Sequence, residues 1–145
     1  MHHHIWEIKQ RKTIEIIDSF VVDDRISAIL KRLKNEGYVV ACATNSIRET
    51  AKLQLIRRGF FEHIDFLYSN QDVKNPKPST EIYLRCMIKA EASPDETIVI
   101  EDSHIGRKAA LNSGAHLCAV KNSDDLTYEK IEKIIAKVNN KKIMT

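Results

Sequence analysis

The sequence has few of the residues that mark specialised protein classes. It has only four glycines, three prolines and three cysteines among 145 residues. No apolar run approaches the roughly 20 residues of a membrane-spanning helix, and the N-terminus lacks the apolar stretch of a secretory signal. The cysteines are odd in number and have apolar neighbours, which is typical of a reducing compartment. We therefore predict a cytoplasmic protein without a membrane partner.

Other missing patterns exclude several kinds of binding. The formal net charge of +3 is too small to indicate a nucleic-acid partner. No Cys/His spacing fits a zinc site. The four glycines do not form the Gly-x-x-x-x-Gly-Lys-Ser/Thr loop of nucleotide-binding proteins. We also find no internal repeat, low-complexity tract or linker.

What remains is a regular alternation of short apolar runs and helical patterns. Strands alternating with helices predict an α/β fold, a three-layer Rossmann-like parallel sheet with helices on both faces. We expect strands at about 39–43, 64–68, 98–101 and 115–120. We expect helices starting near residues 24, 46, 80, 103 and 127.

Helix-start and helix-stop signals set the boundaries. Ser46 and Glu49 fit a capping box that begins a helix ending near Arg58, and Gly59 follows its end. Ser93 and Glu96 fit a second capping box, with proline at the first helical position.

Polar residues follow two of the predicted strands. Thr44 and Asn45 come directly after 39–43, and a hydroxyl and an amide at a helix start can hold a phosphate. Glu101 and Asp102 end the run 98–101, where two carboxylates suit Mg²⁺. Ligands of open parallel sheets bind outside the carboxyl ends of the strands. Ser103 could support this acid pair.

A lysine in a stiff loop completes the set. Lys77 lies between Pro76 and Pro78, which restrict the backbone on both sides. Its ammonium could neutralise a phosphate oxygen as a point charge. Each feature alone is common, but the order Thr44, Lys77, Glu101-Asp102 is specific.

In these residues the chain resembles the haloacid dehalogenase superfamily, in its β-phosphoglucomutase-like branch. Thr44 matches the second motif of that family. Lys77 matches the third, and the run Lys77-Pro78-Ser79-Thr80-Glu81-Ile82-Tyr83 is similar to the branch's Lys-Pro-x-Pro-Asp/Glu-Ile-Tyr. Glu101-Asp102-Ser103 with Gly106 matches the fourth motif. The resemblance covers about residues 8 to 122 and implies a magnesium-dependent phosphatase or phosphotransferase.

The family's first motif, Asp-x-Asp after the first strand, does not occur in this sequence. In the family its first Asp attacks phosphorus and forms an aspartyl-phosphate, a known covalent strategy. The resemblance implies that the chain starts inside the helical cap, with residues 1–22 a remnant of the cap and 23–145 a core domain missing its first strand. The catalytic set would then be Lys77 and Thr44 without a nucleophile. Thr44, Asn45 and Lys77 would bind phosphate, and Asp102 with Glu101 would hold Mg²⁺.

A missing first strand would leave a gap in the middle of the sheet. Unpaired buried backbone groups cost about 1–3 kcal/mol each, so the gap must be closed. The flanking strands could meet directly, another chain or a second copy could insert a strand, or the N-terminal segment could fill the place. Residues 13–22 are the local candidate for that insertion, and they fit a helix equally well.

Three functions remain open from the sequence. In the first, the chain is a hydrolase of this family that is active when another segment or chain supplies a nucleophilic Asp. In the second, it is a regulatory relative that binds phosphate and Mg²⁺ without catalysis. In the third, it is an inactive remnant. The substrate would be a phosphorylated small molecule, with sugar phosphates an analogy from the branch. A receiver domain is excluded because its acids come early and its lysine last, whereas the acid pair comes last here.

Overall fold

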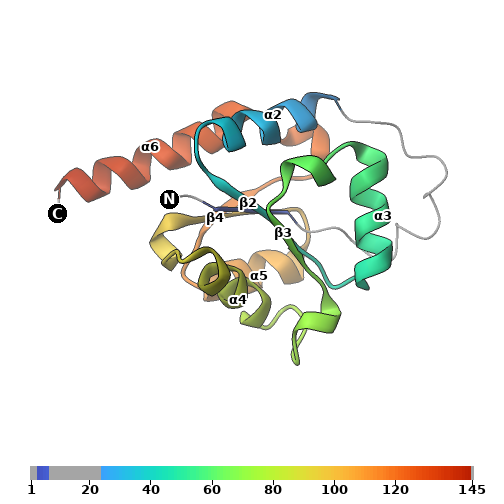
Figure 1. Ribbon diagram of the computed structural model, residues 1–145. Helices are drawn as coiled ribbons and strands as arrows, with labels where there is room; N and C mark the ends of the chain where they lie inside the picture. Colours follow the sequence, from blue (N-terminus) through green and yellow to red (C-terminus); the bar gives the residue numbers. More distant parts are fainter. Residues whose placement is uncertain (1–2, 7–23, 145) are drawn as a thin grey trace.

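The computed structural model describes residues 3–6 and 24–144. Its five strands form one parallel sheet in the order β3-β2-β1-β4-β5 (Figure 1). The strands are β1 (His3–Trp6), β2 (Val39–Ala43), β3 (Phe66–Tyr68), β4 (Thr97–Glu101) and β5 (His116–Ala119). The predicted parallel α/β architecture is confirmed.

Helices cover both faces of the sheet, as Figure 1 shows. One face packs against α2 (Asp24–Asn35), α3 (Arg48–Arg58) and α6 (Tyr128–Met144). The other packs against α4 (Glu81–Ala90) and α5 (His104–Asn112). Short 3-10 helices lie between these elements: η2 (Phe61–His63), η3 (Asn70–Asp72), η4 (Pro94–Glu96) and η5 (Ser123–Asp125).

Alternate side chains of the central strands enter opposite cores. Cys42 and Ile100 belong to the core under α2 and α6, whereas Ala43 and Val99 belong to the core under α4 and α5. All four are at most 2% exposed. This two-sided burial explains why these strands are continuous apolar runs rather than alternating ones.

The predicted gap in the sheet is not present, and this corrects the sequence analysis. β1 lies between β2 and β4 and pairs in parallel with both, so that Ile5 is opposite Ala41 on one side and Val99 on the other. The N-terminal segment therefore fills the central place through residues 3–6, whereas the predicted candidate, residues 13–22, lies outside the described residues. Residues 3–6 thus belong to the sheet of the core. The rest of the segment that we predicted to be a cap remnant lies outside the described residues.

One predicted helix cap is also wrong. The residue before α3 is Ile47, which caps the helix without a side-chain hydrogen bond. Ser46 instead belongs to the turn after β2, where its backbone N–H donates to Thr44 Oγ1 over 3.0 Å. The predicted end of α3 is confirmed, because Gly59 adopts the left-handed conformation there, with φ of 79°. The Ser93–Glu96 capping box is confirmed as well, although it begins the short helix η4.

Across the part of the chain that the structure describes, no helix combines the length and hydropathy that crossing a bilayer would require.

Candidate functional site

The predicted site residues lie at the carboxyl edge of the sheet and come from three separate parts of the chain. Thr44 and Asn45 follow β2, and Glu101 is the last residue of β4. Lys77 lies in the loop between η3 and α4. Because parallel strands end at the same edge, residues far apart in the sequence meet there.

Lys77 is the residue that joins the motifs. It is 4% exposed, and its Nζ donates to the Ala43 carbonyl oxygen over 3.0 Å. The same ammonium lies 3.4 Å from Glu101 Oε2 in an ion pair whose two side chains are both 0% exposed. It also lies 4.9 Å from the centre of the Tyr83 ring, within reach of a cation–π interaction. A lysine charge is thus held inside the protein next to the end of β2.

The turn after β2 is tied to the lysine loop. Asn45 Oδ1 accepts a hydrogen bond from the backbone N–H of Lys77 over 3.1 Å. Thr44 is fully buried, and its backbone N–H donates to the Tyr68 carbonyl oxygen over 3.0 Å. Its Oγ1 accepts from the Ser46 N–H, as described above. The hydroxyl of Thr44 therefore has a fixed direction within the turn.

Glu101 accepts hydrogen bonds on both carboxylate oxygens. Its Oε1 accepts from the backbone N–H groups of Asp102 and Ser103, over 3.0 and 2.8 Å. Its Oε2 accepts from the Tyr83 hydroxyl over 3.0 Å, in addition to the contact with Lys77. The carboxylate thus fixes both the turn after β4 and the ammonium of Lys77.

Asp102 is half-buried at the start of the turn that leads into α5. Ser103 caps α5, which begins near residue 103 as predicted, because its Oγ accepts from the Gly106 N–H over 3.0 Å. Mg²⁺ is usually bound by one or two carboxylates together with water and substrate phosphate, so Asp102 fits as one ligand. Among the described residues, no group of three or more His, Cys, Asp or Glu side chains could hold a metal ion.

The loop before Lys77 is anchored by the first residue of α4. The Glu81 carboxylate accepts from the backbone N–H groups of Lys74 and Asn75 and pairs with Arg85 Nε over 2.7 Å. The Arg85 hydrogen bond and those from Lys74 and Asn75 lower the pKa of Glu81 to about 2. Glu81 matched the resembling motif, but its anchoring role was not predicted.

The structure adds two residues that sequence reasoning missed. Tyr83, on α4, reaches Glu101 although 18 residues separate them. Arg107, on α5, donates through Nη2 to the Val120 carbonyl oxygen over 2.7 Å and through Nε to the Glu101 carbonyl oxygen over 3.4 Å. It thereby joins the ends of β4 and β5. Tyr83 stood within the resembling motif, but nothing in the sequence pattern indicated its partner.

Cys86 lies near Lys77 but is not an activated nucleophile. It is 2% exposed, and burial raises the pKa of its thiol to about 12, against the opposing effect of Lys77. The reactive form of cysteine is the thiolate, so this residue is protonated at neutral pH.

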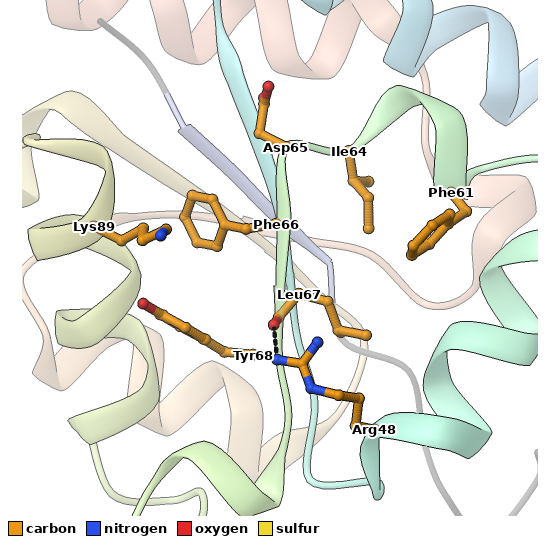
Figure 2. Close-up of a pocket in the computed structure, with 8 residues that line it drawn as sticks. All are labelled: Arg48, Phe61, Ile64, Asp65, Phe66, Leu67, Tyr68 and Lys89. Carbon is orange, nitrogen blue, oxygen red and sulfur yellow. Dashed lines mark hydrogen bonds between the residues drawn. The ribbon is translucent and has the colours of Figure 1, made fainter.

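A separate cavity of about 420 Å³ lies along the open edge of β3. Figure 2 shows Arg48 beside Leu67, where its guanidinium donates to the Leu67 carbonyl oxygen over 2.8 Å. Arg48 also pairs with Asp72 over 3.2 Å. Covering an exposed strand edge with a charged side chain limits unwanted strand pairing. The lining contains none of the predicted site residues; it consists of Arg48, Phe61, Ile64, Asp65, Phe66, Leu67, Tyr68 and Lys89.

Comparison with known proteins gives a matching family and related sequences. Residues 3–120 match the family described as haloacid dehalogenase-like hydrolase. The chain is 25% identical over 132 residues to pyrophosphatase PpaX of Bacillus cereus (strain B4264), covering 83% of this chain and 61% of the relative. It is 32% identical over 85 residues to the phosphorylated carbohydrates phosphatase of Thermotoga maritima, covering 59% of this chain and 39% of the relative. The chain thus spans only about half the length of these curated relatives.

Solved structures share the fold. A β-phosphoglucomutase of Clostridium difficile superimposes with a TM-score of 0.71 at 21% identity, covering 90% of this chain and 63% of that one. A hydrolase of the family from Deinococcus radiodurans R1, solved with bound phosphate and sodium, gives a TM-score of 0.75 at 20% identity, covering 87% and 64%. The matching family spans most of the sequence, from β1 to the residue after β5. The chain therefore belongs to the haloacid dehalogenase-like hydrolases.

Proposed function

We propose that the chain forms the phosphate- and magnesium-binding part of a phosphatase- or phosphotransferase-type site. Thr44, Asn45 and Lys77 bind the phosphate, Asp102 holds Mg²⁺, and Glu101 pairs with the ammonium of Lys77. Hydrolysis requires a nucleophilic Asp from another segment or chain. The observation that carries this proposal is the buried contact of Lys77 with both the end of β2 and Glu101.

The roles follow from the chemistry of each group. Lys77 supplies a positive charge that offsets the charge of a phosphoryl group, and burial strengthens such an interaction by lowering the local dielectric. Thr44 and Asn45 supply a hydroxyl and an amide beside it, at the end of β2. When bound, Mg²⁺ would draw charge from the phosphate oxygens, and the half-buried Asp102 is its protein ligand.

The substrate class is a phosphorylated small molecule. Two relatives carry names that specify pyrophosphate and phosphorylated carbohydrates, which agree with a phosphoryl-transfer site. Sugar phosphates remain an analogy with the β-phosphoglucomutase-like branch.

The need for a supplied nucleophile rests on the sequence after β1. The last residue of β1 is Trp6, and the sequence continues Glu7-Ile8-Lys9 rather than Asp-x-Asp. Glu7 lies outside the described residues. The lack of Asp-x-Asp anywhere in the sequence is also what favours the alternative function, a catalytically inactive protein that binds phosphate and Mg²⁺ in a regulatory role.

The test is Mg²⁺-dependent hydrolysis of an aryl phosphate by the purified chain and its Asp102→Asn variant. We expect no turnover by the chain alone, and turnover that depends on Asp102 once a segment carrying Asp-x-Asp is added. Turnover by the chain alone that is lost in Asp102→Asn would contradict the need for a supplied nucleophile. Variants of Glu7, Asp18, Asp23 and Asp24 would then identify the carboxylate. Failure of every complementing segment, with phosphate binding retained, would favour the regulatory alternative.

A further inference from the structure

Tyr83 has a buried hydroxyl group to which the proposed function assigns no direct role. It lies on α4, is fully buried, and its hydroxyl donates to Glu101 Oε2 over 3.0 Å. The face of its ring lies 4.9 Å from Lys77 Nζ. One side chain therefore contacts both members of the buried ion pair.

The two carboxylate oxygens of Glu101 have different hydrogen-bond donors. Backbone N–H groups of the turn after β4 hold Oε1, which leaves Oε2 to meet the lysine. The separation of Lys77 Nζ and Glu101 Oε2 is 3.4 Å, longer than the usual distance of a charge-assisted hydrogen bond, about 2.7–2.9 Å. The Tyr83 hydroxyl, at 3.0 Å, is the closer donor to that oxygen. Glu101 Oε2 is therefore shared between the tyrosine hydroxyl and the ammonium.

We propose that Tyr83 is a positioning residue for the phosphate-binding lysine, holding Glu101 so that the ammonium of Lys77 stays beside the end of β2. In this arrangement Glu101 serves the lysine and the turn, and Asp102 is the member of the acid pair that meets the metal. The part that concerns phosphate rests on the proposed function, whereas the positioning of Lys77 does not.

The chain offers a matched control. Tyr128 donates to Glu36 Oε1 over 2.5 Å, which is also a hydrogen bond from a tyrosine hydroxyl to a glutamate. This pair joins α6 to the residue after α2, on the opposite face of the sheet from α4. Tyr83→Phe and Tyr128→Phe thus remove the same kind of hydrogen bond, one at the proposed site and one away from it.

The experiment has two arms. In the first, the ammonium signal of Lys77 is observed by ¹H–¹⁵N NMR without ligand and assigned by its loss in Lys77→Met. We expect Tyr83→Phe to shift or broaden this signal and Tyr128→Phe to leave it unchanged. Loss of stability alone would not move the signal of the folded protein. An unchanged signal in Tyr83→Phe would overturn the positioning role.

In the second arm, inorganic phosphate and Mg²⁺ are titrated separately by calorimetry. We expect Tyr83→Phe to raise the dissociation constant of phosphate about tenfold, the lower end of the effect of losing a hydrogen bond to a charged group. The Mg²⁺ dissociation constant should not change, because Asp102 is untouched. Equal weakening of both ligands would overturn the assigned division between Glu101 and Asp102. A wild-type chain that binds no phosphate would refute the proposed function and leave the NMR arm to decide the role of Tyr83.

Discussion

Lys77 and Glu101 form an ion pair in which neither side chain has any exposed surface. Removing two charges from water is costly, so a pair of this kind is poor support for stability by itself. Removing only one of the two charges destabilises the fold further, because the remaining charge is left buried without its partner. The pair therefore makes the fold depend on Lys77, which we assign to phosphate binding, and on the carboxylate that compensates its charge.

We expect Glu101→Gln to lower the free energy of unfolding by about 3–5 kcal/mol, because Lys77 loses its compensating charge. Urea unfolding measures this change. The double variant Lys77→Met/Glu101→Gln removes both charges and should recover part of the loss. A single variant within about 1 kcal/mol of wild type would mean that the pair is not buried as described.

Thr44→Val should remove the acceptor of the Ser46 N–H and destabilise the protein by about 1–3 kcal/mol, the cost of an unsatisfied buried donor. It should also weaken the binding of inorganic phosphate. Thr44→Ser keeps the hydroxyl and is the control, with smaller effects on both measurements. A Thr44→Val variant that is as stable as Thr44→Ser and binds phosphate equally well would contradict the role of the hydroxyl.

The anchor of the lysine loop predicts a dependence on pH. The pKa of Glu81 is about 2 in the folded protein, below its ordinary value of 4.5, so its carboxylate stabilises the fold above pH 4.5. This contribution is lost as the pH falls from 4.5 toward 2. Melting temperatures between pH 6 and pH 3 should therefore fall less steeply for Glu81→Gln than for wild type. Parallel curves would refute the anchor.

The thiols should be unreactive in the folded protein. Cys42, Cys86 and Cys118 are all buried, and burial raises the pKa of Cys86 to about 12. We expect iodoacetamide to label none of the three at pH 8 in native protein and all three in urea, as read by mass spectrometry. Rapid native labelling of Cys86 would show that the core under α4 opens readily.

Because β1 lies at the centre of the sheet, we expect its backbone N–H groups to be essential for folding. Ile5→Pro removes an N–H from a strand that pairs on both sides, and proline is not tolerated in such a strand. We expect loss of cooperative thermal unfolding, with Ile5→Val, which keeps the N–H, close to wild type. A folded Ile5→Pro variant would mean that residues 3–6 do not form the central strand.

Strands β2 to β5 could be predicted because each is an apolar run bounded by helix starts and stops. β1 could not be predicted in the same way. A strand buried in the middle of a parallel sheet is usually a continuous apolar run, but β1 reads His-His-Ile-Trp. Only the pairing with β2 and β4 identifies it. Likewise, the Ser46–Glu49 pattern fitted a capping box, but the turn after β2 uses Ser46 and α3 begins after Ile47.

The grouping of the candidate site residues at one edge of the sheet could be predicted from the sequence, but their network of contacts could not. Thr44, Lys77 and Glu101 follow from motif order, because parallel strands end at one edge. The contacts of Glu101 with Tyr83 and Lys77 depend on how α4 packs on the sheet, which no local pattern encodes. The sequence therefore indicated Glu101 as a metal-binding carboxylate. The contacts show that Glu101 also accepts four hydrogen bonds from protein donors.

The most direct test is calorimetric titration of the wild-type chain with inorganic phosphate, with and without Mg²⁺, beside Lys77→Met and Asp102→Asn. We predict that wild type binds phosphate and that Mg²⁺ tightens the binding. Lys77→Met should lose phosphate binding, and Asp102→Asn should keep the Mg²⁺-free binding but lose the tightening. Binding that is unchanged in both variants would contradict a phosphate and magnesium site at this edge of the sheet.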